Sequence, residues 1–426
     1  MTQISLAKQG KTTAQMKQVA KSEKIAAEVI RKGIAAGRIV IPCNPVHAPS
    51  SLGIGDGLRV KVNANIGTSR EYCNLKEEVE KASVAVAAGA HAVMDLSTGG
   101  DLDAIRRRLL KTVPVPFGTV PIYQAGIEAI EKRGSIVDMT ADDMFSMVEH
   151  QAKQGVDFAV VHVGITKVSV ERLRKQKRVI PMVSRGGSFH MAWILHHGLE
   201  NPLYEDFEYL LEIAKRYDVT LSLGDGMRSG ALADSNDRAK FQELLLIGEL
   251  VEKARKAGVQ TMVEGPGHMP LSDIQANIQV MKTVTNKAPY FVLGPLVTDI
   301  APGYDHFVGG IGGAFAGFCG ADFLCYVTPA EHLCLPDKQD VRDGVVATRI
   351  AAHAADLARG LDRDVDASFS AAREDLDWEK MFKLCIDPSR AKEYRAKRSP
   401  SEDTNACSMC GNLCALELVK KYLKNK

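Results

Sequence analysis

Short runs of apolar, mostly β-branched residues recur through the middle of the chain and alternate with stretches of helical periodicity. The apolar runs occupy residues 91–97, 117–123, 157–164, 178–184, 219–226, 259–268, 290–296 and 321–329. Amphipathic stretches between them occupy residues 69–89, 141–155, 201–217 and 237–258. Strands that alternate with helices are typical of parallel βαβ units. Eight such units predict an α/β protein with a (β/α)8 TIM barrel over residues 71–340.

A doubly wound open sheet is the structural alternative to the barrel. No GxGxxG motif follows the first apolar run, and this disfavours the dinucleotide-binding form of such a sheet. The pattern therefore favours the closed barrel.

The segments outside the barrel have different patterns. Residues 1–70 combine helical periodicity with a glycine-rich stretch and predict a small N-terminal domain. Residues 341–390 predict packed C-terminal helices. Residues 391–426 predict a flexible tail, because the segment 387–406 is charged and turn-rich, before a short helix at 415–426.

Composition limits the classes of partner. The chain has 426 residues, a net charge of +2 and 45% hydrophobic residues, so no broad basic surface is expected for nucleic acid or anionic lipid. The N-terminus has no signal-like apolar segment, and no apolar run is long enough to cross a membrane. We therefore expect a cytoplasmic protein, in which clustered cysteines more often bind metal or do redox work than form disulfides.

Polar residues and glycines gather where the predicted strands end, which is the active-site face of a barrel. The segments "SRGGS" and "GDGMRSG" each combine glycines with an arginine. Glycine lets the backbone approach a ligand, and the arginine fork suits phosphate or carboxylate. Tight turns with incidental arginines would explain one such segment. Several such segments on one rim favour a phosphorylated small-molecule substrate.

Two histidines follow neighbouring predicted strand ends. His268 and His332 could share a metal, with water or substrate completing its shell. From spacing alone, two polar rim residues bonded to backbone are the simpler interpretation. The other histidines that we considered are interpreted as structural or surface residues: His47, His91, His150 and His353.

Three of the nine cysteines lie close together near the C-terminus. Cys407, Cys410 and Cys414 form a C-x2-C-x3-C pattern. Thiolates at this spacing can wrap one metal centre. A structural zinc site needs a fourth ligand, and none is nearby. Three thiolates on a [4Fe-4S] cluster leave one iron open for a small molecule, which is typical of radical S-adenosylmethionine (SAM) enzymes. Zinc and a redox-active thiol group are the alternatives.

Long motifs in the chain resemble the thiamine pyrimidine synthase family, the radical SAM 4-amino-5-hydroxymethyl-2-methylpyrimidine phosphate synthases. These motifs are "VNANIGTS", "MDLSTGG", "GTVPIYQA", "VSRGGS", "SLGDGMRSG", "EGPGHMP", "LGPLVTDIAPGYDH", "CYVTPAEHL" and "AAHAADLA". The resemblance runs from about residue 10 to the end. It implies a barrel fold, a homodimer with exchanged cluster tails, and 5-aminoimidazole ribonucleotide as substrate. It also implies an electron donor such as flavodoxin or ferredoxin.

The resemblance assigns roles to individual residues. It implies that His268 and His332 bind Zn²⁺ and that Cys407, Cys410 and Cys414 hold the [4Fe-4S] cluster. It places Cys325 near the site, although a buried core cysteine is equally consistent with its position. The implied substrate-binding residues are Asn65, Met94, Tyr123, His162, Ser184, Arg185, Gly186, Asp225, Gly226, Met227, Arg228, Glu264 and the position of Phe291.

Three departures from the pyrimidine synthase pattern affect the predicted product. The last cysteine spacing is one residue shorter, Phe291 stands where the family has a tyrosine, and "GDGMRSG" replaces "GDGLRPG". The short spacing and "IPCNPVHAPS" resemble the branch that makes 5-hydroxybenzimidazole for the lower ligand of cobamides. We therefore expect a carbon–carbon lyase that makes 5-hydroxybenzimidazole, with phosphomethylpyrimidine synthase as the alternative. A non-catalytic zinc-binding barrel is a further alternative.

Overall fold

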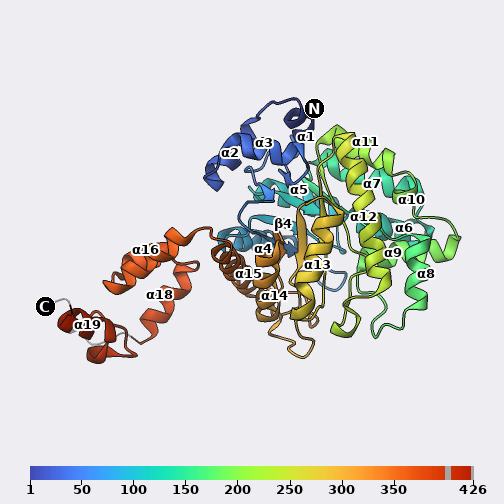
Figure 1. Cartoon of the computed structure of the whole chain (residues 1–426). Coiled ribbons are helices and arrows are strands. Elements are labelled where there is room, and N and C mark those ends of the chain that lie inside the picture. The colour runs from blue at the N-terminus through green and yellow to red at the C-terminus, as the bar shows by residue number, and fades with distance from the viewer. Residues whose placement is uncertain (399–403, 424–426) are drawn as a thin grey trace. The chain divides into compact units, whose positions relative to one another are not determined.

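The computed structural model describes residues 1–398 and 404–423, and its largest element is a closed barrel of parallel strands (Figure 1). Neighbouring strands follow the order β10-β3-β4-β5-β6-β7-β8-β9, so the barrel closes where β10 pairs with β3. The strands are β3 (Lys61–Ile66), β4 (Ala92–Asp95), β5 (Phe117–Thr119), β6 (Phe158–Val161), β7 (Thr220–Leu223), β8 (Thr261–Gly265), β9 (Tyr290–Leu293) and β10 (Phe323–Cys325). The predicted (β/α)8 barrel is confirmed.

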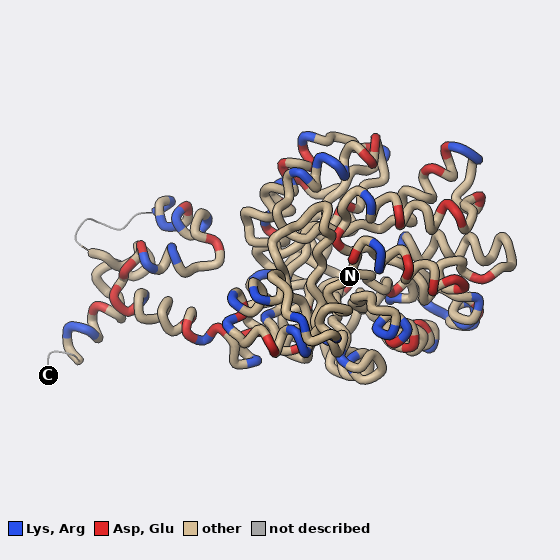
Figure 2. The backbone as a smooth tube through the Cα atoms, turned by 90° about the horizontal axis from the view of Figure 1, so that it is seen from above, with Lys and Arg blue, Asp and Glu red and all other residues tan. Residues whose placement is uncertain are grey.

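Helices follow every strand and cover the outside of the barrel, as in other folds of this kind (Figure 1). They are α4 (Leu75–Ala87), α5 (Leu102–Thr112), α6 (Pro121–Arg133), α7 (Ala141–Gln154), α8 (Lys167–Lys175), α9 (Arg185–His197), α10 (Pro202–Glu205), α11 (Phe207–Tyr217), α12 (Arg238–Ala257), α13 (Leu271–Val284), α14 (Asp305–Cys319) and α15 (Lys338–Ala358). Lysines and arginines are interspersed with aspartates and glutamates along these helices (Figure 2). None of the helices in the described part of the chain is long and apolar enough to span a membrane.

The first barrel strand lies inside the range predicted for the N-terminal domain. Strand β3 contains Asn63 and Asn65, and the Asn63 amide donates to the Asn65 side-chain oxygen at 2.7 Å. Because of these polar side chains, the segment lacks the apolar pattern of a barrel strand, although β3 pairs with β4 and β10. A boundary at residue 70 would therefore separate one strand from its barrel.

The run 178–184 was predicted as a strand, and this prediction is wrong. It forms a loop between α8 and α9, and the side chain of Val179 is 71% exposed. Arg178 bonds the Asp237 carboxylate and donates to the carbonyl of Met227 at 2.7 Å. Without strand neighbours on either side, the apolar run has no ladder to join.

The residues before β3 pack at the N-terminal ends of the barrel strands. They form α1 (Gln3–Lys8), α2 (Ala14–Glu23), α3 (Ala27–Ala35) and the antiparallel pair β1 (Ile39–Val40) and β2 (Ile54–Gly55). His47 Nδ1 lies 2.6 Å from Asp157, just before β6, and Gln260, just before β8, bonds the backbone of Ile41. This region therefore closes the end of the barrel opposite the strand C-termini.

The chain divides into two compact units, Met1–Asp356 and Leu357–Lys426. The second unit contains α16 (Arg363–Glu374), α17 (Trp378–Leu384), α18 (Pro388–Lys397) and α19 (Ala415–Leu423). Helix α18 occupies much of the charged segment 387–406 that was predicted to be flexible, and residues 399–403 and 424–426 of the predicted tail lie outside the described residues. Arg395 stacks 3.7 Å from the Trp378 ring, and the Trp378 indole donates to the carbonyl of Asn405 at 2.8 Å. These contacts hold α17, α18 and the cysteine segment together.

Candidate active site

The C-terminal ends of the barrel strands surround a cavity of about 420 Å³, a size that suits a small-molecule ligand. Every strand contributes to its wall through the strand itself or the loop that follows it. The residues from our sequence prediction that line this cavity are Asn65, Met94, Tyr123, His162, Arg185, Asp225, Arg228, Glu264, Phe291, Cys325 and His332.

Four predicted residues support the wall instead of lining it. Ser184 caps the N-terminus of α9 and accepts from the Gly187 amide at 3.1 Å. Gly186 packs against His162, since an added Cβ would lie 2.2 Å from His162 Cε1. The backbone amides of Gly226 and Met227 donate to the Glu243 carboxylate at 2.9 and 2.8 Å.

A buried charge pair occupies one wall of the cavity. Arg228 Nη1 lies 3.3 Å from Asp225 Oδ1. Burial disfavours the charged form of Arg228, but Asp225, Tyr123 and Glu264 together outweigh it and raise the arginine pKa. Asp225 Oδ2 and Arg228 Nε make no hydrogen bond within the described chain. A ligand in the cavity could satisfy both atoms, which otherwise cost free energy when buried.

Glu264 faces the same region from β8. Burial, followed by repulsion from Asp225, raises the pKa of Glu264 to about 8, although Ser222 donates to it at 2.8 Å. Glu264 is therefore mostly protonated at neutral pH. The guanidinium of Arg185 lies 5.1 Å from the centre of the Tyr123 ring, close enough for a cation–π contact. The two arginines leave this part of the cavity positively charged at neutral pH.

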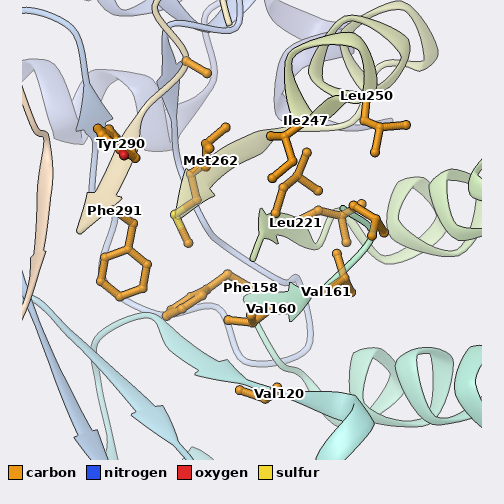
Figure 3. Packing of buried hydrophobic residues seen from close by; sticks show 14 of the residues in the cluster. Val120, Phe158, Val160, Val161, Leu221, Ile247, Leu250, Met262, Tyr290 and Phe291 are labelled. Carbon is orange, nitrogen blue, oxygen red and sulfur yellow. The ribbon is translucent and has the colours of Figure 1, made fainter. Parts of the chain in front are cut away.

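Phe291 and Tyr290 are neighbours on β9 and point in different directions (Figure 3). Phe291 lines the cavity and stacks on Phe323, with ring centroids 4.3 Å apart. The Tyr290 side chain packs against Gly265, where an added Cβ would meet its hydroxyl at 2.1 Å. Tyr290 thus does not replace the hydroxyl that the cavity lacks at position 291.

The two candidate metal ligands lie together. The rings of His268 and His332 have centroids 5.2 Å apart. His268 Nδ1 lies 2.7 Å from Asp299 and His332 Nδ1 lies 3.3 Å from Asp305. A carboxylate on one ring nitrogen orients the other toward a metal, as at many zinc sites. Two histidines with carboxylate partners therefore suit a divalent metal whose shell is completed by substrate or water.

Several contributors to the site were missed by the sequence analysis. Asp299 and Asp305 contact the two candidate metal-binding histidines, Glu243 accepts from the Met227 amide, and Glu331 lines the cavity beside His332. Cys325, which the sequence analysis did name, is buried and accepts from the Asn65 amide at 3.0 Å. The motif "DIAPGYDH" contains both aspartates and was the available signal for two of these residues.

The three tail cysteines belong to the second compact unit. Cys410 is exposed, Cys407 is partly exposed and Cys414 is buried. Hydrogen bonds from the backbone amides of Met409 and Cys410 lower the pKa of the Cys407 thiol. Over residues 1–398 and 404–423, no three His, Cys, Asp or Glu side chains converge on a metal-sized point.

Comparison with known proteins decides the family. The model of the radical SAM ThiC family matches residues 2–421. The chain belongs to this family. It is accordingly a radical SAM lyase, and the family implies a [4Fe-4S] cluster and SAM as cofactors.

The sequences of named relatives match this chain over nearly the full length of both proteins. Phosphomethylpyrimidine synthases from Moorella thermoacetica, Pyrococcus abyssi and Thermus thermophilus are 56%, 55% and 54% identical, covering 99–100% of this chain and 98–99% of theirs. A dihydropteroate synthase structure from Coxiella burnetii aligns with 72% of this chain and 96% of its own at 11% identity and a TM-score of 0.43. The named relatives support the pyrimidine alternative better than the 5-hydroxybenzimidazole product that the motifs led us to expect.

The cysteine segment fits the cluster that the family implies. Cys407, Cys410 and Cys414 supply three thiolates from one short loop, and Gly411, with φ +51°, gives that loop a turn that other residues rarely adopt. The thiols do not converge in this structure, and small metal loops often close only around their metal. The donor set therefore suits a cluster with one iron left open.

Proposed function

We propose that this chain is a phosphomethylpyrimidine synthase, which converts 5-aminoimidazole ribonucleotide into 4-amino-5-hydroxymethyl-2-methylpyrimidine phosphate for thiamine biosynthesis. The observation that carries this proposal is the 54–56% identity, over nearly the whole length, to relatives of that name. The cavity supports it, since about 420 Å³ suits a small nucleotide.

The phosphate of the substrate would bind at the arginine side of the cavity. Arg185 starts α9, and Arg228 follows β7. Their guanidinium groups supply charge-assisted hydrogen bonds to phosphate oxygens. Protonated Glu264 would not repel the phosphate and could donate a hydrogen bond to the substrate. Asn65 and His162 supply further polar groups to the ribose and imidazole.

Cofactors complete the proposal. Cys407, Cys410 and Cys414 would hold the [4Fe-4S] cluster, which when bound supplies the electron that cleaves SAM. His268 and His332 would hold one Zn²⁺ beside the cavity. A homodimer with exchanged tails and a flavodoxin or ferredoxin electron donor remain part of the proposal.

The second candidate is a 5-hydroxybenzimidazole synthase acting on the same substrate. The short Cys410–Cys414 spacing and Phe291 in the cavity wall favour it. Loss of a hydroxyl at position 291 removes a hydrogen bond worth about 1–3 kcal/mol when its partner is buried, enough to change how an intermediate is held.

Complementation separates the two candidates. The full chain is expressed in a bacterium that lacks its own phosphomethylpyrimidine synthase, with the Cys410→Ala variant as the matched control. The proposal predicts growth without thiamine for the wild-type chain alone. No growth, together with fluorescent hydroxybenzimidazole in the medium, would support the second candidate instead.

A further inference from the structure

Glu243 is a buried residue of α12 that lies behind the cavity wall. Its Oε1 accepts from the Gly226 amide at 2.9 Å, and its Oε2 accepts from the Met227 amide at 2.8 Å. These two amides lie between Asp225 and Arg228, which both line the cavity. Glu243 therefore acts on the cavity through the backbone that carries two of its charged side chains.

The two hydrogen bonds do not depend on the charge of Glu243. Burial, followed by repulsion from Asp225, raises the pKa of Glu243 to about 8, while the two amides oppose this increase. Each oxygen of a carboxyl group keeps a lone pair for an incoming donor in both protonation states. What the segment requires from Glu243 is therefore two acceptors side by side.

Two further loops pack against the same place. A Cβ added at Gly164 would lie 2.5 Å from Glu243 Cγ, and one added at Gly187 would lie 2.8 Å from Gly226 Cα. Close packing of this kind transmits a shift of one backbone to its neighbours. Glu243 thus lies at the junction of three loops, whose cavity-lining residues are His162, Arg185, Asp225 and Arg228.

The rest of the segment is bonded as a turn. The Arg228 amide donates to the Asp225 carbonyl at 3.1 Å, and Arg178 donates to the Met227 carbonyl at 2.7 Å. Removing the Glu243 acceptors would leave two buried donors unpaired, which is costly. We expect the turn to shift until both donors find new partners.

We propose that Glu243 is a positioning residue that places Arg228 to receive the phosphate of the substrate. The Arg228 side chain leaves the backbone one residue after Met227, so a shift of the Met227 amide moves the guanidinium. Arg228 Nε makes no hydrogen bond within the described chain and is available to a ligand. A charge-assisted bond to a phosphate oxygen weakens steeply when its geometry is lost. This role rests on the proposed substrate, 5-aminoimidazole ribonucleotide, which both candidate products share.

The first measurement needs no ligand. Glu243→Gln keeps the size of the side chain but replaces one acceptor with an NH2 group, which faces an amide donor. Amide hydrogen exchange of the full-length protein is followed by mass spectrometry. Exchange should be about tenfold faster than in wild type in peptides that contain residues 224–229. Unchanged exchange in these peptides would overturn the proposal.

The second measurement compares two ligands by calorimetry. 5-Aminoimidazole ribonucleotide carries the phosphate, and the corresponding ribonucleoside does not. The ratio of the two affinities should fall about tenfold in Glu243→Gln, because the variant loses affinity mainly for the phosphate. A ratio within about threefold of the wild-type ratio would overturn the proposal, since general loosening of the cavity weakens both ligands alike.

Two variants of the same helix are the controls. Glu249→Gln makes the same change at an exposed position of α12 and should behave as wild type in both measurements. Ile247→Val removes one buried methyl group, which lowers stability, and should leave the affinity ratio unchanged. A fall of the ratio in Ile247→Val as large as in Glu243→Gln would also overturn the proposal.

A second variant covers failure of the first to fold. Glu243→Asp withdraws the carboxyl group by one methylene, and a wild-type ratio in this variant would overturn the proposal equally. If wild type does not bind the ribonucleotide, the proposed substrate is wrong. The exchange measurement, made without ligand, then decides by itself whether Glu243 holds the segment.

Discussion

At the scale of single residues, burial sets the charge of the site more than residue type does. Asp225 and Glu264 are both acidic, yet only Asp225 has an arginine at hydrogen-bonding distance. Burial and then repulsion from Asp225 favour the neutral form of Glu264, although Ser222 donates one hydrogen bond to it. Burial raises the pKa of both acids, and at Asp225 the charge of Arg228 and a hydrogen bond from it oppose that increase.

The pKa of Glu264 makes stability depend on pH. A carboxyl group whose pKa is raised to about 8 in the folded state stabilises the fold fully below its unfolded pKa, and this stabilisation is lost as pH rises through 8. We expect the free energy of unfolding to fall between pH 6 and 9 by at least about 1 kcal/mol more in wild type than in Glu264→Gln. Because the Glu264 side chain is only partly buried by surface area, solvent reduces the size of this effect. Urea denaturation measures the free energy of unfolding, with Glu131→Gln at an exposed position of α6 as the control. Equal pH slopes for all three proteins would contradict this expectation.

The histidine pair gives a second residue-scale prediction. His268→Ala or His332→Ala removes one of the two proposed protein ligands and should lower zinc content per subunit by more than tenfold. Asp299→Asn keeps both histidines and should weaken retention by a smaller factor, because it changes only the orientation of His268. Metal analysis after dialysis provides the measurement. Full zinc occupancy in both alanine variants would show that the pair holds no metal.

At the scale of elements, the barrel was predictable, but its first strand was missed and one apolar run was wrongly assigned as a strand. Apolar runs flanked by helical periodicity marked seven of the eight strands correctly. Strand β3 was missed because Asn63 and Asn65 serve the interior of the barrel, and residues 178–184 were misassigned because apolar character alone does not show that a run has pairing partners. The cavity residues were found through motifs, whereas Glu243 lies on helix α12 and holds the backbone of the Asp225–Arg228 segment from behind the wall.

The loop 178–184 gives the element-scale prediction. Arg178 holds this loop through Asp237 and the Met227 carbonyl, and Val183 of the same loop lines the cavity. Arg178→Ala should therefore increase the rate of limited proteolysis within 176–184 several-fold and weaken ribonucleotide binding. Arg174→Ala, an exposed arginine on α8, is the control. Unchanged cleavage in Arg178→Ala would show that other contacts hold the loop.

At the scale of the whole molecule, the residues proposed to bind substrate and those proposed to hold the cluster belong to different compact units. The cavity and histidine pair belong to Met1–Asp356, and the three cysteines belong to Leu357–Lys426. Cys410→Ala should abolish 5′-deoxyadenosine formation while leaving the melting temperature and ribonucleotide affinity of the barrel unchanged. Cys385→Ala, in the same unit but outside the C-x2-C-x3-C segment, should remain active. Normal 5′-deoxyadenosine yield from Cys410→Ala would exclude this cysteine as a cluster ligand.

The central claim concerns the product, and mass spectrometry tests it most directly. Purified enzyme, reconstituted with iron and sulfide without oxygen, is given 5-aminoimidazole ribonucleotide, SAM and a strong reductant. Our account predicts 4-amino-5-hydroxymethyl-2-methylpyrimidine phosphate, a product that carries a phosphate, as the main new compound. Phosphate-free 5-hydroxybenzimidazole as the main product would contradict it.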